Sequence, residues 1–329
     1  MTADATPPLL SVRDLTVDFQ TEGGLITAVD SVSFDLREGE ILALVGESGC
    51  GKSATALAIL RLIANPPGRI ASGSVRFRGN DLLQASENEI RGIRGDRIAM
   101  IFQEPMTSLN PVLTVGRQIG EPLSLHKGLS DAPLLEKCVA LLESVSISDP
   151  RRRLGDYPHQ FSGGMRQRVM IAMGMGCVPD IIIADEPTTA LDVTIQAQLL
   201  ELLRQQVEQH RTALLLITHN LGVVARYADR VNVMYAGRIV ESAGADELYA
   251  RPRHPYTIGL LHSVPRLDKP AADKLAPIPG QPPDALHMPG GCAFHPRCPY
   301  AVARCHAEAP SPRQVGANQV VACWVDVDA

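Results

Sequence analysis

The eight residues Gly46–Ser53 constrain this chain more than any other part of its sequence. They read Gly-Glu-Ser-Gly-Cys-Gly-Lys-Ser, a complete G-x-x-x-x-G-K-S pattern. They follow an apolar run at 41–45 (ILALV), short enough for a buried parallel strand, and precede a helical stretch, ATALAILRLI. Glycines let backbone N–H groups turn inward around phosphate oxygens, and the next helix directs its positive end at them. The pattern therefore predicts a nucleotide-binding phosphate loop.

The side chains at the end of this phosphate loop have expected partners. Lys52 can reach the β- and γ-phosphates of a nucleotide, and the Ser53 hydroxyl can ligate Mg²⁺. The rest of the loop is expected to surround the phosphates with its backbone: Gly46, Glu47, Ser48, Gly49, Cys50 and Gly51.

A pair of acids follows a second buried run. The segment Ile181-Ile-Ile-Ala ends in Asp185 and Glu186. Asp185, at the end of a buried strand, is placed to hold Mg²⁺ directly or through water. Glu186 can polarise the water that attacks the γ-phosphorus. His219 follows the apolar run ALLLI in the same way, so it could contact the γ-phosphate or be structural.

These runs predict the fold class and the organisation of the chain. Strands at 10–20, 41–45, 181–184 and before His219, with helices between them, indicate an α/β sheet with its site at the carboxyl edge. Residues of about 87–160 are predicted to form a mostly helical, irregular insertion. Proline becomes frequent from residue 251, which indicates a loop-rich C-terminal extension beginning near residue 262.

Composition narrows the function classes. The net charge of −5 gives no support for a broad basic face that binds nucleic acid. No segment approaches the ~18 unbroken apolar residues that a membrane helix needs, and the N-terminal MTADATPPLL lacks the features of a signal peptide. We therefore expect a cytoplasmic protein whose membrane role, if it has one, comes through a partner.

Four of the seven cysteines lie in the last forty residues, with the spacing C-x5-C-x6-C-x17-C. In a reducing compartment such a cluster predicts metal binding before disulfides. The close pairs typical of structural zinc and the ferredoxin runs are both absent, so spacing leaves the metal open. Unliganded thiols are the alternative, and His295 and His306 are possible substitute ligands. The cysteines are Cys292, Cys298, Cys305 and Cys323.

A second small-residue helix start occurs at 161–168, FSGGMRQR. Alone, Ser162, Gly163 and Gly164 would be an ordinary serine N-cap with a glycine turn. A chain with two helix ends suited to anions but one phosphate loop indicates a site completed by another subunit.

In order along the chain, these motifs resemble the ATP-binding cassette (ABC) family over residues of about 9–250. The signature departs from the common LSGGQ at Phe161 and Met165, a variant similar to the peptide-permease branch. The matching motifs are the Walker A sequence GESGCGKS, Gln103 in FQEPMTSLNP (Q-loop), FSGGMRQR (signature), IIIADEPTTALD (Walker B and D-loop) and His219 in ITHN (switch).

The resemblance implies a P-loop NTPase fold with a RecA-like core, an antiparallel β subdomain and a helical subdomain. It also implies that ATP is hydrolysed at the interface of a dimer. Two ATPase subunits meet head to tail, and each ATP lies between the phosphate loop of one and the Ser162-Gly163-Gly164 corner of the other. The resemblance implies that Lys52 and Ser53 bind phosphate and Mg²⁺, that Asp185 positions Mg²⁺ and that Glu186 is the general base. Gln103 would sense Mg²⁺ and the attacking water, and His219 would sense the γ-phosphate. Asp192 would communicate across the dimer interface. Phe19 matches a position where an aromatic ring stacks on adenine, and by pattern alone it is equally a core residue.

Three further segments resemble the oligopeptide/dipeptide permease ATPases: EPMTSLNP, RHPYTIGLLHSVP and the Pro- and Cys-rich tail. This resemblance implies an importer for peptides, with two permease subunits that dock on the helical insertion, a second identical or homologous ATPase, and an external peptide-binding protein. It also implies a [4Fe–4S] cluster on the tail cysteines, with zinc as the alternative. Relatives that carry nickel or other solutes share these features. The two rivals are a soluble ABC ATPase that acts on ribosomes or DNA and a regulatory or scaffold subunit with a dead site. The expected domains are residues 1–261, with a helical subdomain at about 87–165, and the extension 262–329.

Overall fold

The computed structural model describes residues 7–104, 108–188, 193–263 and 278–327. The chain forms two compact units, which we call the first and second unit and describe separately. The first unit comprises Met1–Asp35, Leu42–Leu83 and Thr218–Ala329, and the second comprises Leu36–Ile41 and Gln84–Ile217.

The first unit contains an antiparallel sheet in the order β2-β1-β4-β5. Its long strands alternate apolar and polar residues, and Leu10, Val12 and Val17 of β1 are fully buried. β1 pairs with β4 from Leu10 opposite Phe77 to Phe19 opposite Gly68. The strands are β1 (Leu10–Thr21), β2 (Gly24–Leu36), β4 (Gly68–Phe77) and β5 (Asn80–Asp81).

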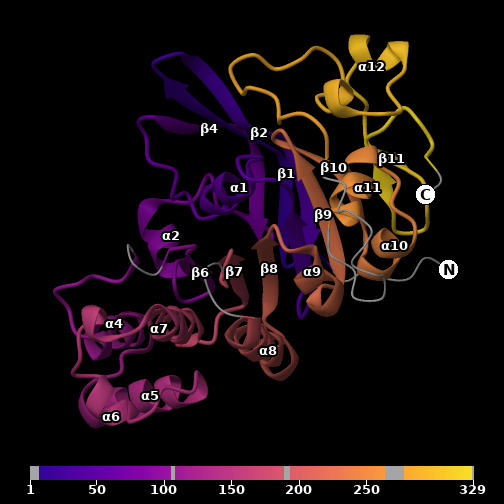
Figure 1. Ribbon diagram of the computed structural model, residues 1–329. Coiled ribbons are helices and arrows are strands. Elements are labelled where there is room, and N and C mark those ends of the chain that lie inside the picture. The colour runs from indigo at the N-terminus through magenta and orange to yellow at the C-terminus, as the bar shows by residue number, and fades with distance from the viewer. Residues whose placement is uncertain (1–6, 105–107, 189–192, 264–277, 328–329) are drawn as a thin grey trace. The chain divides into compact units, whose positions relative to one another are not determined.

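The other strands of the first unit lie in the order β11-β12-β10-β9-β3. β3 is parallel to β9, so the segment before the phosphate loop lies beside a strand nearly 190 residues further along the chain, coloured orange in Figure 1. The strands are β3 (Ile41–Val45), β9 (Arg230–Tyr235), β10 (Arg238–Gly244), β11 (Arg313–Gln314) and β12 (Val320–Val321); the helices are α1 (Lys52–Ile59), α9 (Leu221–Tyr227), α10 (Ala245–Ala250), α11 (Pro255–His262), η2 (His295–Arg297) and α12 (Ala303–Ala307).

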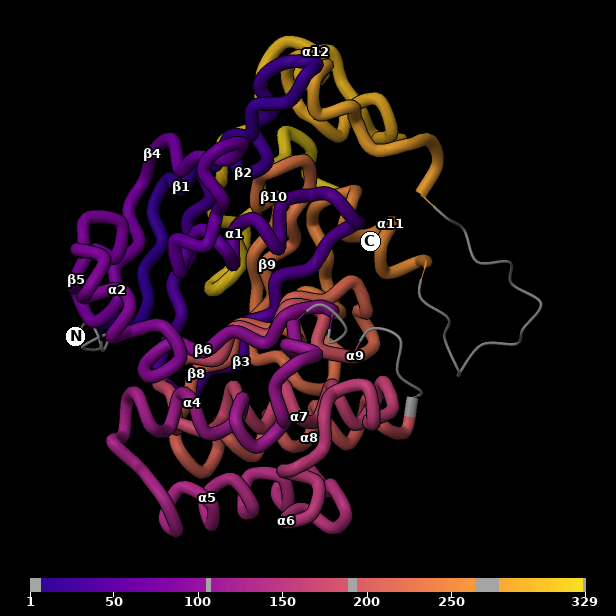
Figure 2. Tube along the Cα trace, turned by 90° about the vertical axis from the view of Figure 1, so that its left-hand side faces the viewer, coloured from indigo at the N-terminus to yellow at the C-terminus, as the bar shows by residue number. Residues whose placement is uncertain are grey.

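The second unit combines three parallel strands, in the order β6-β7-β8, with a group of helices. α4, α5 and α7 pack against one another, as Figure 2 shows. The elements are α2 (Glu87–Ile93), β6 (Ile98–Ile101), α4 (Val115–Lys127), α5 (Asp131–Ser144), α6 (Pro150–Arg153), η1 (Pro158–Gln160), α7 (Gly163–Met175), β7 (Ile181–Asp185), α8 (Val193–His210) and β8 (Ala213–Thr218).

The predicted strands are confirmed, and four elements differ from the sequence-based expectation. The helix after the phosphate loop starts at Lys52 and ends at Ile59, before the predicted end, because Arg61 turns to a φ of 53°. β6 lies inside the segment predicted to be helical and irregular, since its run IAMI pairs with β7. β11 and β12 add two short strands to the extension, and β12 pairs with β10.

The extension packs into the core of the first unit. The ring of Phe294 makes an edge contact with Tyr235 at 5.1 Å and lies 5.4 Å from the ring of Tyr256. Cys292 and Cys298 pack against the same cluster. The buried Glu241 of β10 accepts a hydrogen bond of 2.8 Å from Gln319. The described part of the tail is therefore an integral layer of this unit.

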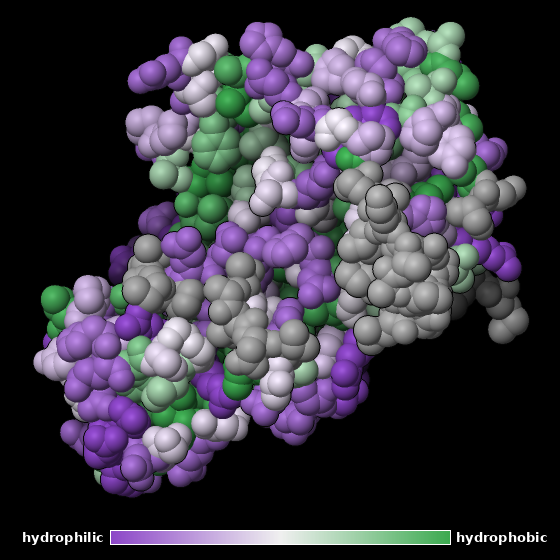
Figure 3. Space-filling view, in the orientation of Figure 1, coloured by the Kyte–Doolittle hydropathy of each residue, from purple (hydrophilic) through white to green (hydrophobic). Residues whose placement is uncertain are grey.

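Within the described ranges, no helix has both the length and the apolar character needed to cross a membrane. On the face shown in Figure 3, hydrophilic residues predominate over α5 and α6.

Candidate functional site

The phosphate loop lies in the first unit, between β3 and α1. α1 begins at Lys52, and the residue before it, Gly51, has a φ of 104°. The Lys52 side chain is folded back along the loop, where its Nζ donates to the carbonyl oxygens of Gly46 (2.8 Å) and Glu47 (2.9 Å). Lys52 is only 5% exposed. The ammonium group is thus held where phosphates would approach the helix N-terminus.

Two glycines of the loop are required by close backbone contacts. A Cβ on Gly46 would lie 2.2 Å from the carbonyl oxygen of Met234 on β9. A Cβ on Gly51 would lie 2.3 Å from the carbonyl oxygen of Ala28 on β2. The loop can therefore pass between these strands only where side chains are absent.

The remaining predicted residues of the loop differ in exposure. Ser48 and Gly49 are exposed and Ser53 is half-buried. The Cys50 thiol is buried, and this burial raises its pKa, although Lys52 lies 3.7 Å away. Cys50 is accordingly a neutral packing residue at neutral pH, and only its backbone could face a nucleotide.

Glu47 has partners that the sequence did not predict. Its carboxylate accepts hydrogen bonds from Arg297 of the extension, at 2.7 Å and 3.0 Å, and its backbone N–H donates to the Tyr256 hydroxyl at 2.8 Å. These bonds to Glu47 raise the pKa of the Arg297 guanidinium above its already high ordinary value. Because the two residues are 250 positions apart, no local sequence signal pointed to this pair.

Phe19 and His219 also belong to the first unit. Phe19 is half-buried on β1, opposite Gly68, and a Cβ on Gly68 would lie 2.8 Å from its ring. His219 is exposed at the end of β8, immediately before Asn220, which caps α9 by accepting from the N–H groups of Gly222 and Val223. The stacking of Phe19 on adenine and the contact of His219 with the γ-phosphate stay predictions.

The acidic pair lies in the second unit, at the carboxyl end of β7. Asp185 and Glu186 are 4% and 9% exposed. Glu186 has a φ of +46°, and its N–H donates to the carbonyl of Ile217 at 2.9 Å. The side-chain amide of Gln103 donates to the Glu186 carboxylate at 3.1 Å. The structure thus brings together the predicted general base and the predicted Q-loop residue.

A left-handed backbone at a non-glycine residue is uncommon and costs roughly 1–2 kcal/mol. At Glu186 this conformation turns the chain sharply at the end of a buried strand. The bond from Gln103 then fixes the direction of the carboxylate, as expected for a group that must orient water.

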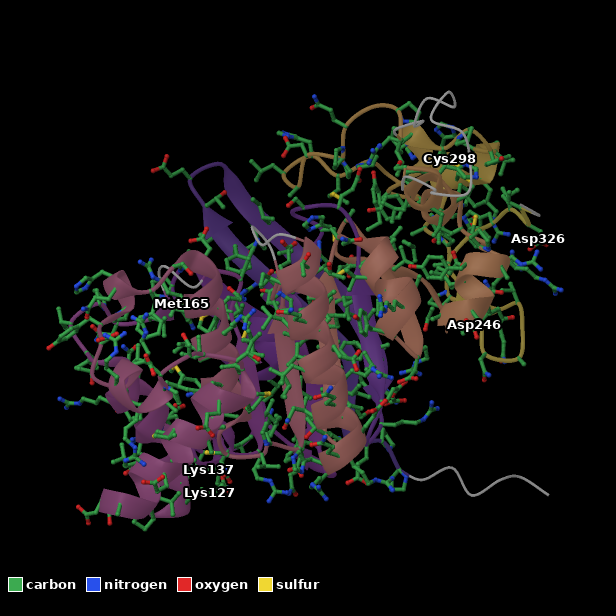
Figure 4. All side chains as sticks on the ribbon, turned by 60° about the horizontal axis from the view of Figure 1, so that its bottom comes forward. Lys127, Lys137, Met165, Asp246, Cys298 and Asp326 are labelled. Carbon is green, nitrogen blue, oxygen red and sulfur yellow. The ribbon has the colours of Figure 1, made fainter. Side chains whose placement is uncertain are left out.

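The signature residues open α7 in the same unit. Ser162 is the N-cap, and its hydroxyl accepts from the N–H of Met165 at 3.4 Å; Met165 is labelled in Figure 4. Ser162 and Gly163 are exposed, and Gly164 is half-buried. Apart from its chain neighbours and the backbone of its own helix, no described atom would lie within 4 Å of a Cβ placed on Gly163. No packing within the described chain therefore requires glycine there.

Gln167, in the same helix, was not predicted to have a role. It is 1% exposed and donates to the carbonyl of Pro187, which follows the acidic pair. This bond ties the signature helix to the segment that carries Glu186. No local sequence signal distinguished Gln167, because its burial arises only when the helix packs in the fold. Asp192, the predicted D-loop residue, lies outside the described residues, as do 105–107 of the Q-loop motif and Pro265, Pro270 and Pro277.

The four tail cysteines are near one another but do not form a metal site as they stand. Burial raises the pKa of the Cys292 and Cys323 thiols, and that of Cys298 to about 11, with further increases from neighbouring cysteines. No group of three or more His, Cys, Asp or Glu side chains arranged to hold a metal occurs in the part of the chain described. His295 instead bonds to the Cys292 carbonyl at 2.9 Å. The predicted metal-binding character of the extension is therefore not observed.

Comparisons with known proteins agree with these motifs. Residues 29–189 match the model of the ABC transporter family, and residues 240–305 match that of the oligopeptide/dipeptide transporter C-terminal region. The chain is 51% identical to the dipeptide transport ATP-binding protein DppD of Bacillus subtilis (96% of this chain and 94% of that protein). It is also 51% identical to the oligopeptide transport ATP-binding protein OppD of Salmonella typhimurium (97% and 94%).

Among solved structures, the dimeric post-hydrolysis state of the ATP-binding cassette MJ0796 bound to ADP and Pi is similar, with a TM-score of 0.65 and 26% identity. The match covers 72% of this chain and 98% of that one.

Proposed function

Because this chain belongs to the ATP-binding subunits of oligopeptide/dipeptide-type ABC transporters, we propose that it hydrolyses ATP to drive the import of peptides through partner membrane subunits. The observation that carries this proposal is an intact hydrolytic set, with Lys52 held by the phosphate loop and Glu186 oriented by Gln103. A regulatory subunit with a dead site would lack one of these groups.

The residues have distinct chemical tasks. Lys52 and the N–H groups at the start of α1 neutralise the phosphates. Mg²⁺ would take oxygen ligands from Ser53 and Asp185, with Gln103, and would supply positive charge against the phosphates. Glu186 takes a proton from the attacking water, and His219 contacts the γ-phosphate. Phe19 stacks on the adenine ring.

A second cassette completes the site. An exposed serine–glycine corner at a helix N-terminus can bind an anion, and the open space at Gly163 leaves room for a group from outside the chain. We propose that this corner caps the ATP held by a partner's phosphate loop, with Asp192 at the interface. The partner is an identical or homologous ATPase.

Substituting Gly163 by valine tests this capping. Because no described atom beyond its chain neighbours and its own helix backbone lies within 4 Å of the added Cβ, the variant is expected to keep its thermal unfolding midpoint and its ATP affinity, while turnover falls about tenfold or more. The matched control is Gly92→Val on α2, a helical glycine that also has open space around it. Equal turnover in the two variants would contradict a role for Gly163 at the dimer interface.

The proposed transporter also contains two permease subunits and an extracytoplasmic peptide-binding protein, so the chain lies peripherally on the cytoplasmic face of the membrane. The helical residues of about 87–165 would receive the permease. We expect the complex in proteoliposomes to hydrolyse ATP faster with peptide-loaded than with empty binding protein, and to accumulate labelled peptide. Stimulation by Ni²⁺ alone would indicate the nickel branch, and stimulation by ribosomes or DNA would contradict a transport role.

The tail cysteines are proposed to hold a structural [4Fe–4S] cluster. Four thiols are the donor set that such a cluster uses, and the backbones of two of these cysteines are already adjacent, since the N–H of Cys292 donates to the carbonyl of Cys305 at 2.8 Å. In the described geometry they would first have to move together. Anaerobically purified protein should then absorb near 400 nm and contain about four iron and four sulfide per chain. Stoichiometric zinc, or no metal at all, would overturn this assignment.

A further inference from the structure

An arginine of the C-terminal extension is bonded directly to the phosphate loop. Arg297 Nη1 lies 2.7 Å from one oxygen of the Glu47 carboxylate, and Nη2 lies 3.0 Å from the other. The same guanidinium donates from Nε to the carbonyl of Pro279 (3.1 Å) and from Nη1 to the Tyr235 hydroxyl (3.4 Å). Arg297 thus joins the extension, β9 and the second residue of the phosphate loop.

This pair differs from the other ion pairs of the extension in its burial. The Arg297 side chain is 5% exposed and that of Glu47 is 28% exposed. The Arg304–Glu308 pair, in contrast, is 56% and 58% exposed. Exposed ion pairs contribute little to stability. A buried, bidentate pair fixes the direction of both side chains, and removal of one partner leaves the other charge buried without compensation.

The segment that carries Arg297 is firmly anchored. Phe294, three residues earlier, is 2% exposed and packs on Tyr235 and Tyr256 in the core of the first unit. Tyr256 in turn accepts the N–H of Glu47 at 2.8 Å. Glu47 is therefore held at its backbone by α11 and at its carboxylate by the extension.

The position of Glu47 bears on Lys52. The Lys52 ammonium is held by the carbonyl oxygens of Gly46 and Glu47. If the Glu47 carboxylate lost its anchor, the peptide that carries this carbonyl would be freer to rotate. Lys52 and the loop N–H groups would then sample more conformations, and ordering them around phosphate would cost more on binding.

We propose that Arg297 is a positioning residue for ATP binding, which acts through Glu47 to preorganise the phosphate loop and so makes the extension a regulator of nucleotide affinity. This inference rests on the proposed ATPase function. We expect the effect on binding, because the Arg297 guanidinium and the Glu47 carboxylate bond to each other, and the remaining bonds of Arg297 go to Pro279 and Tyr235. Arg297 lies directly before Cys298 in the sequence, so the residue that anchors the phosphate loop is the chain neighbour of a tail cysteine.

The test compares variants in the reconstituted transporter complex, with kcat and KM for ATP and the affinity for a fluorescent ATP analogue as readouts. For Arg297→Met we expect KM and the analogue Kd to rise about tenfold, with kcat at saturating ATP within about twofold of wild type. Arg297→Lys keeps the charge but loses the bidentate geometry, so it should restore part of the affinity. Glu308→Gln in the exposed pair is the matched control and should change neither constant.

A double-mutant cycle separates coupling from general damage. Glu47→Gln should weaken binding as Arg297→Met does, and the double variant should be no weaker than the weaker single variant. If Arg297→Met fails to fold, Glu47→Gln still tests the proposal, because Arg297 keeps its bonds to Pro279 and Tyr235 in that variant. Unchanged KM in Glu47→Gln, or effects that multiply in the double variant, would overturn the proposal. If instead the proposed ATPase function is wrong, the wild-type complex itself will not hydrolyse ATP.

Discussion

Replacing Glu186 by glutamine is expected to lower ATP turnover at least a hundredfold while leaving ATP binding intact. A general base contributes about 10²–10⁴ to a rate, and the amide cannot accept the proton of the attacking water. The substitution preserves the local geometry, because the glutamine oxygen can still accept from Gln103, which donates to the Glu186 carboxylate at 3.1 Å. Steady-state ATPase activity of the reconstituted complex and the affinity for a fluorescent ATP analogue together measure this effect.

The same variant should also accumulate the ATP-bound dimer, which size-exclusion chromatography in the presence of ATP would detect. The matched control is Glu208→Gln, an exposed carboxylate paired with Arg204 on α8 of the same unit. That variant should behave as wild type. If Glu186→Gln hydrolysed ATP at a near-normal rate, Glu186 would not be the general base, and another group would have to activate the water.

The sequence predicted the parts of the site whose residues are neighbours in the chain. The phosphate loop could be recognised because its glycines, Lys52 and Ser53 stand at fixed spacing between a strand and a helix. The pair Asp185 and Glu186 was visible for the same reason, since four apolar residues precede it.

Contacts between distant segments were not predictable in this way. Arg297 reaches Glu47 across 250 positions, and its placement depends on how Phe294 packs into the core. The sequence does not distinguish β6 from the helical insertion, because a four-residue apolar run fits a buried strand or a buried helix segment until its pairing with β7 is known. Each of these depends on tertiary packing, which overrides local pattern.

The tail cysteines show that the number and spacing of potential metal ligands do not determine their geometry in the fold. Their number and spacing predicted a metal site, yet the described structure shows thiols that are buried near one another without a ready coordination geometry. What the extension does show is its hold on the phosphate loop, through a residue that lies between two of those cysteines.

Substituting Gly51 by alanine is expected to abolish measurable ATP binding and to lower the thermal unfolding midpoint of the chain. Its φ of +104° costs an alanine roughly 1–2 kcal/mol. A Cβ would in addition lie 2.3 Å from the backbone oxygen of Ala28 and 2.8 Å from the Met234 side chain. The backbone of β2 cannot retreat as a side chain could, so we expect a further cost of about 1–3 kcal/mol. The loop must therefore shift, and Lys52 with it.

Gly49→Ala is the matched control within the same loop. Gly49 has a φ of +80°, but a Cβ there would meet no described atom within 4 Å apart from its chain neighbours, so the control carries the backbone strain without the clash. Thermal unfolding and the affinity for a fluorescent ATP analogue should therefore change much less for Gly49→Ala than for Gly51→Ala. Equal effects in the two variants would mean that the strained backbone alone governs the loop. A larger effect at Gly51 would establish that its close passage beside β2 is what keeps Lys52 in place to bind the phosphates.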